Sequence, residues 1–459
     1  MSLKDIYGYI DEHRVDYVRT LQALLRQPSI AGEKRGIQEC AEMVLGLIRD
    51  TGAEAELVPT SGEGSPVVYG VLRGKRAKRT IVAYQMYDTQ PVLDAESWVS
   101  PPFEAGIVEG KIVARGAINS KGALVAELMA MKALREVAGD MPVNVFFTFD
   151  GEEEVGSWQL RRFLESNPDK LRGAECVWMP GTFSEGYRET QMSLGNKGCI
   201  DFQLSVDQKR VDIHSSCAPV VDNPAWRLVW ALNSMKDIGD RVKIEGFYDR
   251  VRPPSREDVG LIEKIVASGG EERLRRQLGV ERFRRDLHGV ELFKEYIFQP
   301  TLTINGFRSG YTGPAAHTIN PGWAKANLDI RLVPDMDADD IWGRMKRHLQ
   351  EHGFSDVEVT LTGWRANASR SQLNTNIVRA WRAALKSMGF KEPVIYPMMG
   401  GTAPTMYYTA PPLNLASASA GSSDLPPHYA HATNEYITIE EFITTTKMAA
   451  TCLLEYGKL

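Results

Sequence analysis

Three consecutive glutamates, which follow a strongly apolar run, are the first candidates for chemistry in the sequence. Glu152, Glu153 and Glu154 come one Asp-Gly pair after the run VNVFFTF at 143–149. Adjacent carboxylates at the end of a buried strand would repel one another if all were charged, so a bound cation or a shared proton is implied. A solvated acidic turn would explain the composition, but not the strand before it. We therefore predict acid–base chemistry at this strand end.

The elements around this turn have the pattern of an α/β sheet. Residues 4–26 have apolar side chains at helical spacing, and Pro28 then stops the pattern. Strands are expected at 67–72, 80–84 and 143–149, and a helix at 122–137. Strands that alternate with helices indicate a sheet with helices on its faces.

The pattern changes after about residue 196 and returns to α/β character near residue 370. Between these points we expect a four-stranded sheet with two helices on one face, and a helical elaboration at 240–298 that is rich in Arg and Glu. The expected strands are 199–206, 300–306, 326–333 and 357–361, and the expected helices begin near Asn223-Pro224 and cover 337–352. A helix at 375–388, a strand at 394–397 and a last helix at 439–455 follow. We thus predict an α/β domain of residues 1–195 and 370–459, with residues 196–369 as an inserted α+β domain.

The overall composition favours small-molecule chemistry. The chain has 459 residues, 43% of them apolar, and 54 basic against 59 acidic residues give a formal net charge of −5. A chain of this length can form more than one hydrophobic core. An acidic balance does not favour binding to nucleic acid or to an anionic membrane. We expect a small-molecule substrate, and neither nucleic acid nor membrane as a partner.

Two further features predict the cellular location. The first residues carry charges throughout, without the apolar core of a signal peptide, and no segment has about 18 consecutive apolar residues. The five cysteines are few, odd in number and without a CxxC pair, so neither a disulfide framework nor a thiolate zinc site is indicated. We expect a cytoplasmic protein with free thiols.

Four short segments, in this order, resemble motifs of the dinuclear zinc peptidases of family M20, which include carnosinases, aminoacylases and succinyl-diaminopimelate desuccinylase. They are YQMYDTQP at 84–91, ARGAINSKG at 114–122, FDGEEEVGS at 149–157 and HATNE at 431–435. Each alone is weak, but four in order over nearly the whole chain are specific. The resemblance implies a zinc-peptidase-like catalytic α/β domain with an inserted lid or dimerisation domain, and a homodimer.

The resemblance also assigns roles around the acidic turn. In the family, the first of two adjacent glutamates is the general base and the second binds metal, and Glu153 and Glu154 match these positions. Asp88 matches an aspartate that orients a metal-binding histidine. We group Asp88 with Glu153 and His214 as the expected catalytic residues.

Several of the family's metal-binding positions carry unsuitable residues here. Met86 occupies the position of a histidine, Asn119 that of a bridging aspartate and Pro180 that of a further carboxylate, while His431 is kept. A thioether prefers soft ions such as copper(I), an amide does not bridge two cations, and proline offers no ligand atom. Met86 would then pack at a strand end, and a turn or cap role is the alternative for Asn119. We expect at most one weakly held divalent metal, with zinc preferred, bound through Glu154, His431 and Asn119, or none.

The substrate-binding residues implied by the resemblance lie in the second half of the chain and in the inserted domain. His214, in DIHSS at 212–216, matches a histidine that reaches the partner subunit's site and stabilises an oxyanion. Arg331 matches an arginine that binds a substrate carboxylate, for which its planar fork is suited. Gly401 and Thr402 lie in GGTAP at 400–404, which resembles the loop near that carboxylate. A surface histidine and a strand-edge salt bridge are the alternatives for His214 and Arg331.

The altered residues at the metal-binding positions limit the ways in which this chain could hydrolyse an amide. A metal lowers the pKa of bound water from about 15.7 to about 7, which makes hydroxide roughly 12 kcal/mol more accessible. Amide hydrolysis therefore requires one retained metal or a proton-sharing carboxylate pair, such as Glu153 with Glu154 or with Asp88. We predict a dipeptidase-like hydrolase of a small amide with a free carboxylate, either a dipeptide or an N-acyl amino acid.

Two other classes of function stay open at this point. One is a catalytically inactive homologue that binds amino-acid-like ligands. The other is an isomerase or acyl-transfer enzyme in which Glu153 moves a proton. Serine hydrolase chemistry is not expected, because the sequence has no G-x-S-x-G segment.

Overall fold

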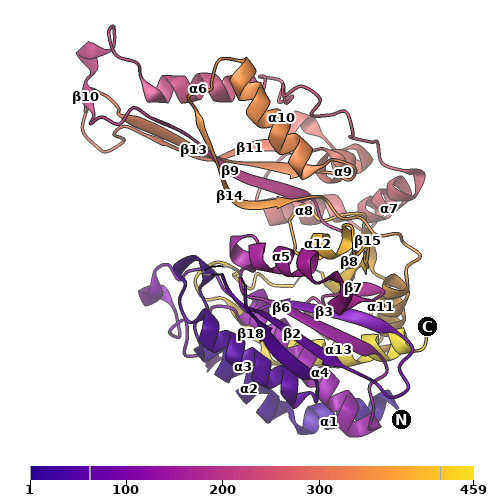
Figure 1. The fold of residues 1–459 in the computed structure, drawn as a ribbon. Coiled ribbons are helices and arrows are strands. Elements are labelled where there is room, and N and C mark those ends of the chain that lie inside the picture. Colours follow the sequence, from indigo (N-terminus) through magenta and orange to yellow (C-terminus); the bar gives the residue numbers. More distant parts are fainter. Residues whose placement is uncertain (1, 61, 63, 424) are drawn as a thin grey trace.

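The computed structural model describes residues 2–60, 62, 64–423 and 425–459, and Figure 1 shows two bodies, one above the other. The lower body is built on a six-stranded sheet in which β3, β6, β7 and β16 are parallel to one another, and β1 and β2 complete one side as antiparallel strands. Across the sheet the strands are β1 (Glu54–Val58), β2 (Val67–Leu72), β6 (Asn144–Asp150), β3 (Thr80–Met86), β7 (Cys176–Trp178) and β16 (Ala416–Ser417). The predicted α/β fold class is confirmed.

Helices cover both faces of this sheet. Successive side chains of a strand point to opposite faces, so each strand can contribute to a hydrophobic core on either side. On β3, Ile81 and Ala83 belong to the larger hydrophobic core, while Val82 and Tyr84 belong to a smaller one. The larger core is formed with α1 (Leu3–Glu12), α2 (Arg14–Arg26), α3 (Ile37–Asp50), α4 (Gly122–Ala138), α11 (Asn376–Ser387) and α13 (Ile439–Gly457). The smaller core is covered by α5 (Trp158–Ser166) and α12 (Thr405–Thr409).

The first predicted helix is interrupted. Instead of one helix over 4–26, the chain forms α1 and α2, which meet at His13, where ψ is 9° and the backbone leaves the helical region. The His13 ring bonds to the carbonyl of Tyr9 at 2.8 Å, and its backbone N–H bonds to the same carbonyl. Both helices still bury the predicted apolar face.

The upper body contains a four-stranded antiparallel sheet in the order β11-β13-β9-β14. Two helices, α6 and α10, pack on one face of this sheet and bury a core around Ile200, Phe202 and Leu204. The opposite face is polar and is turned toward the lower body (Figure 1). The bounds are β9 (Gly198–Asp207), β11 (Thr301–Ser309), β13 (Trp323–Leu332), β14 (Glu358–Ala366), α6 (Pro224–Met235) and α10 (Ala338–Glu351).

The Arg- and Glu-rich segment does not pack on the inserted sheet alone. Its helices α7 (Arg256–Ala267), α8 (Gly270–Leu278) and α9 (Gly289–Phe298) form a separate core with Met398 and with side chains of β15 (Val394–Tyr396). Leu261 of α7 also joins the larger core of the lower body. These helices therefore link the two bodies, and the boundaries of the inserted domain at residues 196 and 369 stay a prediction.

Three smaller sheets complete the fold. One has the order β15-β8-β17, another β18-β5-β4, and the third pairs β10 with β12 at the tip of the upper body (Figure 1). Their strands are β4 (Gly106–Val108), β5 (Lys111–Val113), β8 (Thr190–Ser193), β10 (Ile213–His214), β12 (Ile319–Asn320), β17 (Ser419–Ser422) and β18 (Tyr436–Thr438). Among the described residues, no helix combines the length and the apolar character needed to span a bilayer.

Candidate active site

The carboxyl ends of β3 and β6 bring two of the predicted segments together. The two strands are parallel neighbours, and their last residues, Met86 and Asp150, pair with each other. Asp88 lies two residues after the end of β3, and Glu153 begins a short helical turn after β6. In open α/β sheets, this edge is where ligands bind.

Asp88 holds the acidic turn in place. Its side chain is fully buried, and its two oxygens accept hydrogen bonds from the backbone N–H of Glu153 (3.1 Å) and of Glu154 (3.0 Å). Burial, with the nearby carboxylates of Asp150 and Glu153, raises the pKa of Asp88 well above its usual value. Asp88 thus positions the backbone of the two glutamates, and its expected catalytic role stays a prediction.

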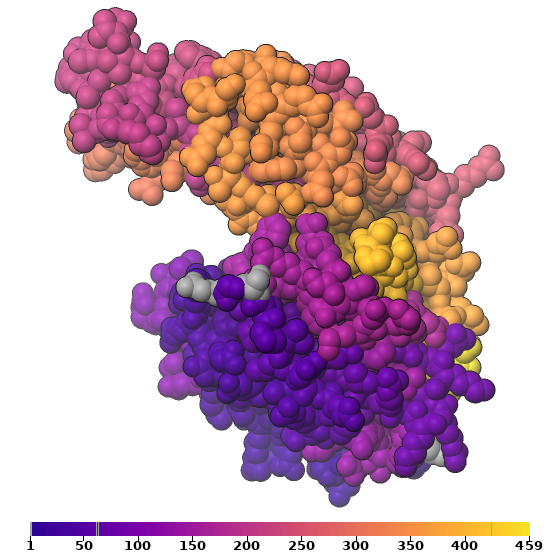
Figure 2. All heavy atoms as spheres, in the orientation of Figure 1, coloured from indigo at the N-terminus to yellow at the C-terminus, as the bar shows by residue number. Residues whose placement is uncertain are grey.

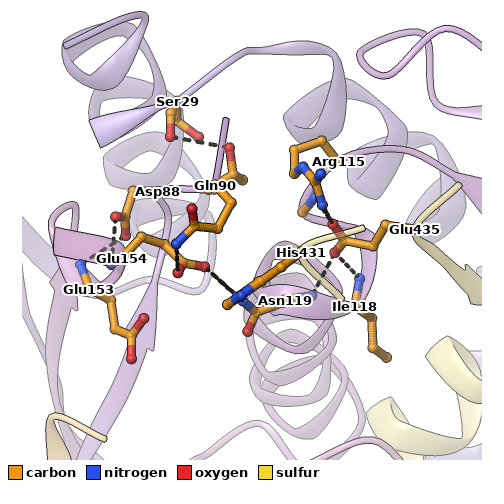
Figure 3. A network of polar contacts seen from close by, with 12 residues as sticks. Ser29, Asp88, Gln90, Arg115, Ile118, Asn119, Glu153, Glu154, His431 and Glu435 are labelled. Carbon is orange, nitrogen blue, oxygen red and sulfur yellow. Dashed lines mark hydrogen bonds and ion pairs between the residues drawn. The ribbon is translucent and has the colours of Figure 1, made fainter. Parts of the chain in front are cut away.

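Glu154 lies at the centre of a network of amide and imidazole groups (Figure 3). One carboxylate oxygen accepts a hydrogen bond from Gln90 Nε2 at 2.7 Å, and the other accepts one from Asn119 Nδ2 at 2.7 Å. His431 Nε2 lies 2.8 Å from the same Asn119 nitrogen and 3.2 Å from Glu154. The three expected metal ligands are therefore together in space, but they contact one another directly.

Glu153 differs from Glu154 in having no such partners. Figure 3 shows its carboxyl group pointing away from Glu154, Asn119 and His431, and it receives no hydrogen bond from the residues that the structure describes. Burial, together with the nearby carboxylates of Glu154 and Asp150, raises the pKa of Glu153 to about 8. This carboxyl group thus holds a proton at neutral pH and is available for proton transfer.

A buried ion pair fixes the loop that carries Asn119. Glu435 accepts a hydrogen bond from Arg115 Nη1 at 2.7 Å, and both side chains are almost fully buried. The same carboxylate accepts the backbone N–H groups of Gly116, Ile118 and Asn119 at 3.0–3.1 Å. Burial raises the pKa of Glu435, although these hydrogen bonds and Arg115 act in the opposite direction. The position of Asn119 is therefore determined by protein contacts.

The other expected metal position offers no ligands. Met86 is 3% exposed at the end of β3, and Pro180, which follows β7, is buried. Across residues 2–60, 62, 64–423 and 425–459, no group of three or more His, Cys, Asp or Glu side chains is arranged to hold a metal ion. The residues present do not fit the two-metal centre that the sequence resemblance implies.

Arg331 and the 400–404 loop meet between the two bodies, as the sequence suggested. Arg331 Nη1 donates to Thr402 Oγ1 at 2.6 Å, and its Nε lies 3.2 Å from Asp329. Gly401 is held through its carbonyl, which accepts from Asn196 Nδ2 at 3.0 Å. The Arg331 side chain is 32% exposed, so it is accessible to a small ligand.

A cavity of about 480 Å³ lies between the acidic turn and the polar face of the inserted sheet. The lower body contributes Glu154 and Val155 to its wall, and the inserted sheet contributes Asp201, Gln203, Asn305, Asn327, Leu328, Thr362, Gly363 and Trp364. Figure 2 shows that the upper body overhangs the lower one on one side. The site is therefore open to a small polar molecule.

His214 does not reach this cavity within one chain. It lies in β10, at the tip of the upper body (Figure 1), and its ring is exposed. Its ring nitrogens contact Ser216 Oγ at 2.8 Å and Thr318 Oγ1 at 3.5 Å. A single chain thus brings together Asp88, Asn119, Glu153, Glu154 and His431, and separately Arg331 with Thr402, but leaves His214 apart.

Three residues of the site were not singled out from the sequence. Gln90, Arg115 and Glu435 each lie inside a segment that carried the resemblance. A neutral amide gives no metal-binding signal, and the ion pair joins residues 320 positions apart. The sequence segments therefore indicated where the site residues lie in the chain, but which side chains contact one another could be seen only in the folded structure.

Comparison with known proteins agrees with the resemblance of the motifs. The family described as Peptidase family M20/M25/M40 matches residues 87–455. A Sulfolobus solfataricus protein described as an M20 family metallo-carboxypeptidase is 34% identical, with a TM-score of 0.87 over 96% of this chain and 99% of that one. The human Beta-Ala-His dipeptidase is 26% identical over 100% of this chain and 93% of its own length. The Cys-Gly metallodipeptidase of Schizosaccharomyces pombe is 25% identical over 76% of each chain.

Proposed function

The chain belongs to peptidase family M20/M25/M40, and from this premise we propose that it is a dipeptidase-like hydrolase of small amides with a free carboxylate. Dipeptides and N-acyl amino acids are the substrates of this class that we expect. The relatives named as dipeptidases and as a carboxypeptidase support hydrolysis over ligand binding alone, isomerisation or acyl transfer. The observation that carries the proposal is the acidic turn, in which Glu154 lines the cavity and the adjacent Glu153 has a carboxyl group with a pKa raised to about 8 and no hydrogen-bond donor from the described residues.

The chain's own residues supply proton transfer and substrate positioning. Glu154 is satisfied as a carboxylate by the N–H groups of Gln90 and Asn119, and its charge keeps the proton on Glu153. A proton-sharing pair with Asp88 is disfavoured because Asp88 is buried, and a pair with Glu154 would require the Glu153 carboxyl group to turn toward Glu154, from which it points away in Figure 3. The protonated Glu153 would donate its proton to the nitrogen of the scissile amide, and the carboxylate so formed would accept a proton from the attacking water, which restores the starting state.

Turnover of a substrate panel tests the proposed function. The full-length protein is incubated with dipeptides and N-acyl amino acids in chelator, and separately with added zinc, manganese or cobalt. Release of an amine from any member of the panel supports the proposal. No turnover under any of these conditions rejects it, and binding of the panel without turnover identifies a ligand-binding homologue instead.

We propose that Arg331 binds the substrate carboxylate. Arg331→Ala should weaken binding by about 1.5–3 kcal/mol, or ~10- to 150-fold, because a charge-assisted hydrogen bond is lost. Lysine should restore only part of the affinity, since it lacks the planar fork. The measurement is KM, or the Kd of a non-hydrolysed analogue, for the free carboxylate and for its carboxamide.

Arg308→Ala is the matched control for Arg331, because Arg308 lies on β11 of the same sheet, near Trp323 and away from Thr402. It should leave KM unchanged. Equal affinity of the wild-type protein for the carboxylate and the carboxamide would show that Arg331 does not have this role.

We also propose that the chain forms a homodimer through the upper body, so that His214 reaches the partner's site. Support comes from α6, where Trp226, Val229 and Trp230 are 40–58% exposed on one helix face, and the two indole rings are stacked. Contiguous apolar side chains on a surface favour a protein interface. Replacing both tryptophans by serine should convert the dimer to a monomer in sedimentation or light-scattering measurements at micromolar concentration.

Val15→Ser serves as the control for the interface, because Val15 is 60% exposed on α2 of the other body. It should leave the dimer intact. A wild-type protein that is strictly monomeric at micromolar concentration would contradict the proposed dimer.

We further propose a cytoplasmic location. All five cysteines are free thiols in the structure, and free thiols are the usual state in the reducing cytoplasm.

A further inference from the structure

We propose that the side-chain amides of Asn119 and Gln90 replace a divalent cation at this centre, and that the chain is a metal-independent member of its family. The inference concerns the site of the proposed function, but it holds whether or not an amide is cleaved there. Of the two alternatives expected from the sequence, it favours the absence of a metal over one metal weakly held by Glu154, His431 and Asn119.

The first argument is the spacing of the polar atoms of the three side chains that were expected to bind a metal. Asn119 Nδ2 lies 2.7 Å from Glu154 Oε1 and 2.8 Å from His431 Nε2. Glu154 Oε1 and His431 Nε2 are 3.2 Å apart. Ligand atoms around a tetrahedral zinc ion, with bonds of about 2.0–2.2 Å, lie about 3.3–3.6 Å from one another. All three separations are shorter, and the two that involve Asn119 have the length of hydrogen bonds. The side chains thus fill the space that an ion would need.

The second argument is the orientation of the Asn119 amide. A carboxamide has two N–H bonds on one nitrogen, so Nδ2 serves Glu154 and His431 at the same time. The reverse orientation would bring the amide oxygen within 2.7 Å of a Glu154 oxygen, so two acceptors would face each other without a proton between them. Asn119 therefore presents donors, not a ligand atom, to its neighbours.

The third argument is the charge of the centre. In a metal site, the cation balances the carboxylate that binds it. Here Gln90 Nε2 and Asn119 Nδ2 each donate to a different oxygen of Glu154, whose side chain is 5% exposed. Charge-assisted hydrogen bonds of this kind stabilise a buried carboxylate without a counterion. A cation is therefore not required to keep Glu154 in place.

The fourth argument is that the Asn119 loop is ordered by the protein itself. The Glu435 carboxylate binds Arg115 and the N–H groups of the loop, including that of Asn119. At the family's other metal position, Met86 and Pro180 are buried and offer no oxygen or nitrogen ligand from their side chains. Both halves of the family's metal centre are thus replaced, one by amides and one by apolar packing.

The test measures metal and not turnover, so it is independent of the proposed hydrolysis. The full-length protein is equilibrated with zinc or manganese, desalted and analysed for metal, and its Tm is measured in each metal and in EDTA. We expect far less than one ion per chain and the same Tm in all three buffers. Asn119→Ala should lower the Tm equally in zinc and in EDTA, because Glu154 loses a donor that zinc does not replace.

A designed reversal tests the same inference from the other side. The triple variant Met86→His, Asn119→Asp and Pro180→Asp restores the ligand types of the family, and it should retain metal through desalting and lose Tm in EDTA. If that variant does not fold, the wild-type metal content, with His431→Ala as control, still decides the question. About one ion or more per wild-type chain, lost in His431→Ala, would overturn the proposal.

Discussion

Replacement of Glu153 by glutamine is expected to lower turnover by about 10²- to 10⁴-fold, the usual contribution of a general acid–base group. The substitution keeps the size of the side chain but removes the exchangeable proton. No hydrogen bond to the Glu153 carboxyl group from the described residues is lost, so the fold should be unaffected. The effect should be on kcat, with KM little changed, because Arg331 provides the contact with the substrate carboxylate.

Glu152→Gln is the matched control, as the adjacent residue of the same turn. The Glu152 carboxylate accepts the backbone N–H groups of Ser65 (2.7 Å) and Gln159 (3.2 Å), so it has a structural role away from the cavity. It should retain most of the turnover. Equal turnover by Glu153→Gln and the wild-type protein would show that the proton is transferred by another group. Exchange of deuterium into a bound analogue without cleavage would indicate isomerase chemistry instead.

The fold was largely predictable because its elements have clear hydrophobic periods. The strand at 80–84 and the helix at 122–137 correspond closely to β3 and α4. Apolar residues that recur every two or every 3.6 residues indicate a strand or a helix from the local sequence alone. The break at His13 was not predictable, because the apolar spacing continues through it. The packing of α7 against β15 was also missed, because it joins segments more than 120 residues apart and leaves no local signal.

The sequence predicted which residues form the candidate site, but not how they hydrogen-bond to one another. Glu154, Asn119 and His431 meet in space as the motifs implied. From the sequence alone, Asn119 could bind a metal or have a turn or cap role, and nothing indicated that Gln90 belongs to the site. Whether the oxygen or the nitrogen of the Asn119 amide faces Glu154 and His431 depends on which of their atoms accept hydrogen bonds. This orientation decides whether Asn119 is a ligand for a cation or a donor to a carboxylate. One amide orientation thus separates a metal centre from a hydrogen-bonded one.

Glu435→Ala is expected to destabilise the protein by about 3–5 kcal/mol, the range seen when one partner of a buried ion pair is removed. The variant would leave the Arg115 guanidinium, which is 2% exposed, without its carboxylate. It would also leave the backbone N–H groups of Gly116, Ile118 and Asn119 without an acceptor. Chemical denaturation of the full-length protein, with unfolding followed by circular dichroism, measures the loss.

The control for this variant is Glu56→Ala, which removes an exposed ion pair. Glu56 is 57% exposed and lies 2.7 Å from Lys170, so its loss should cost about 0–1 kcal/mol. Glu435→Gln should fall between the two, because the amide keeps one acceptor oxygen but loses the charge that faces Arg115. If Glu435→Ala costs no more than Glu56→Ala, the Asn119 loop is not held by this carboxylate, and its order must come from the contacts of Asn119 with Glu154 and His431.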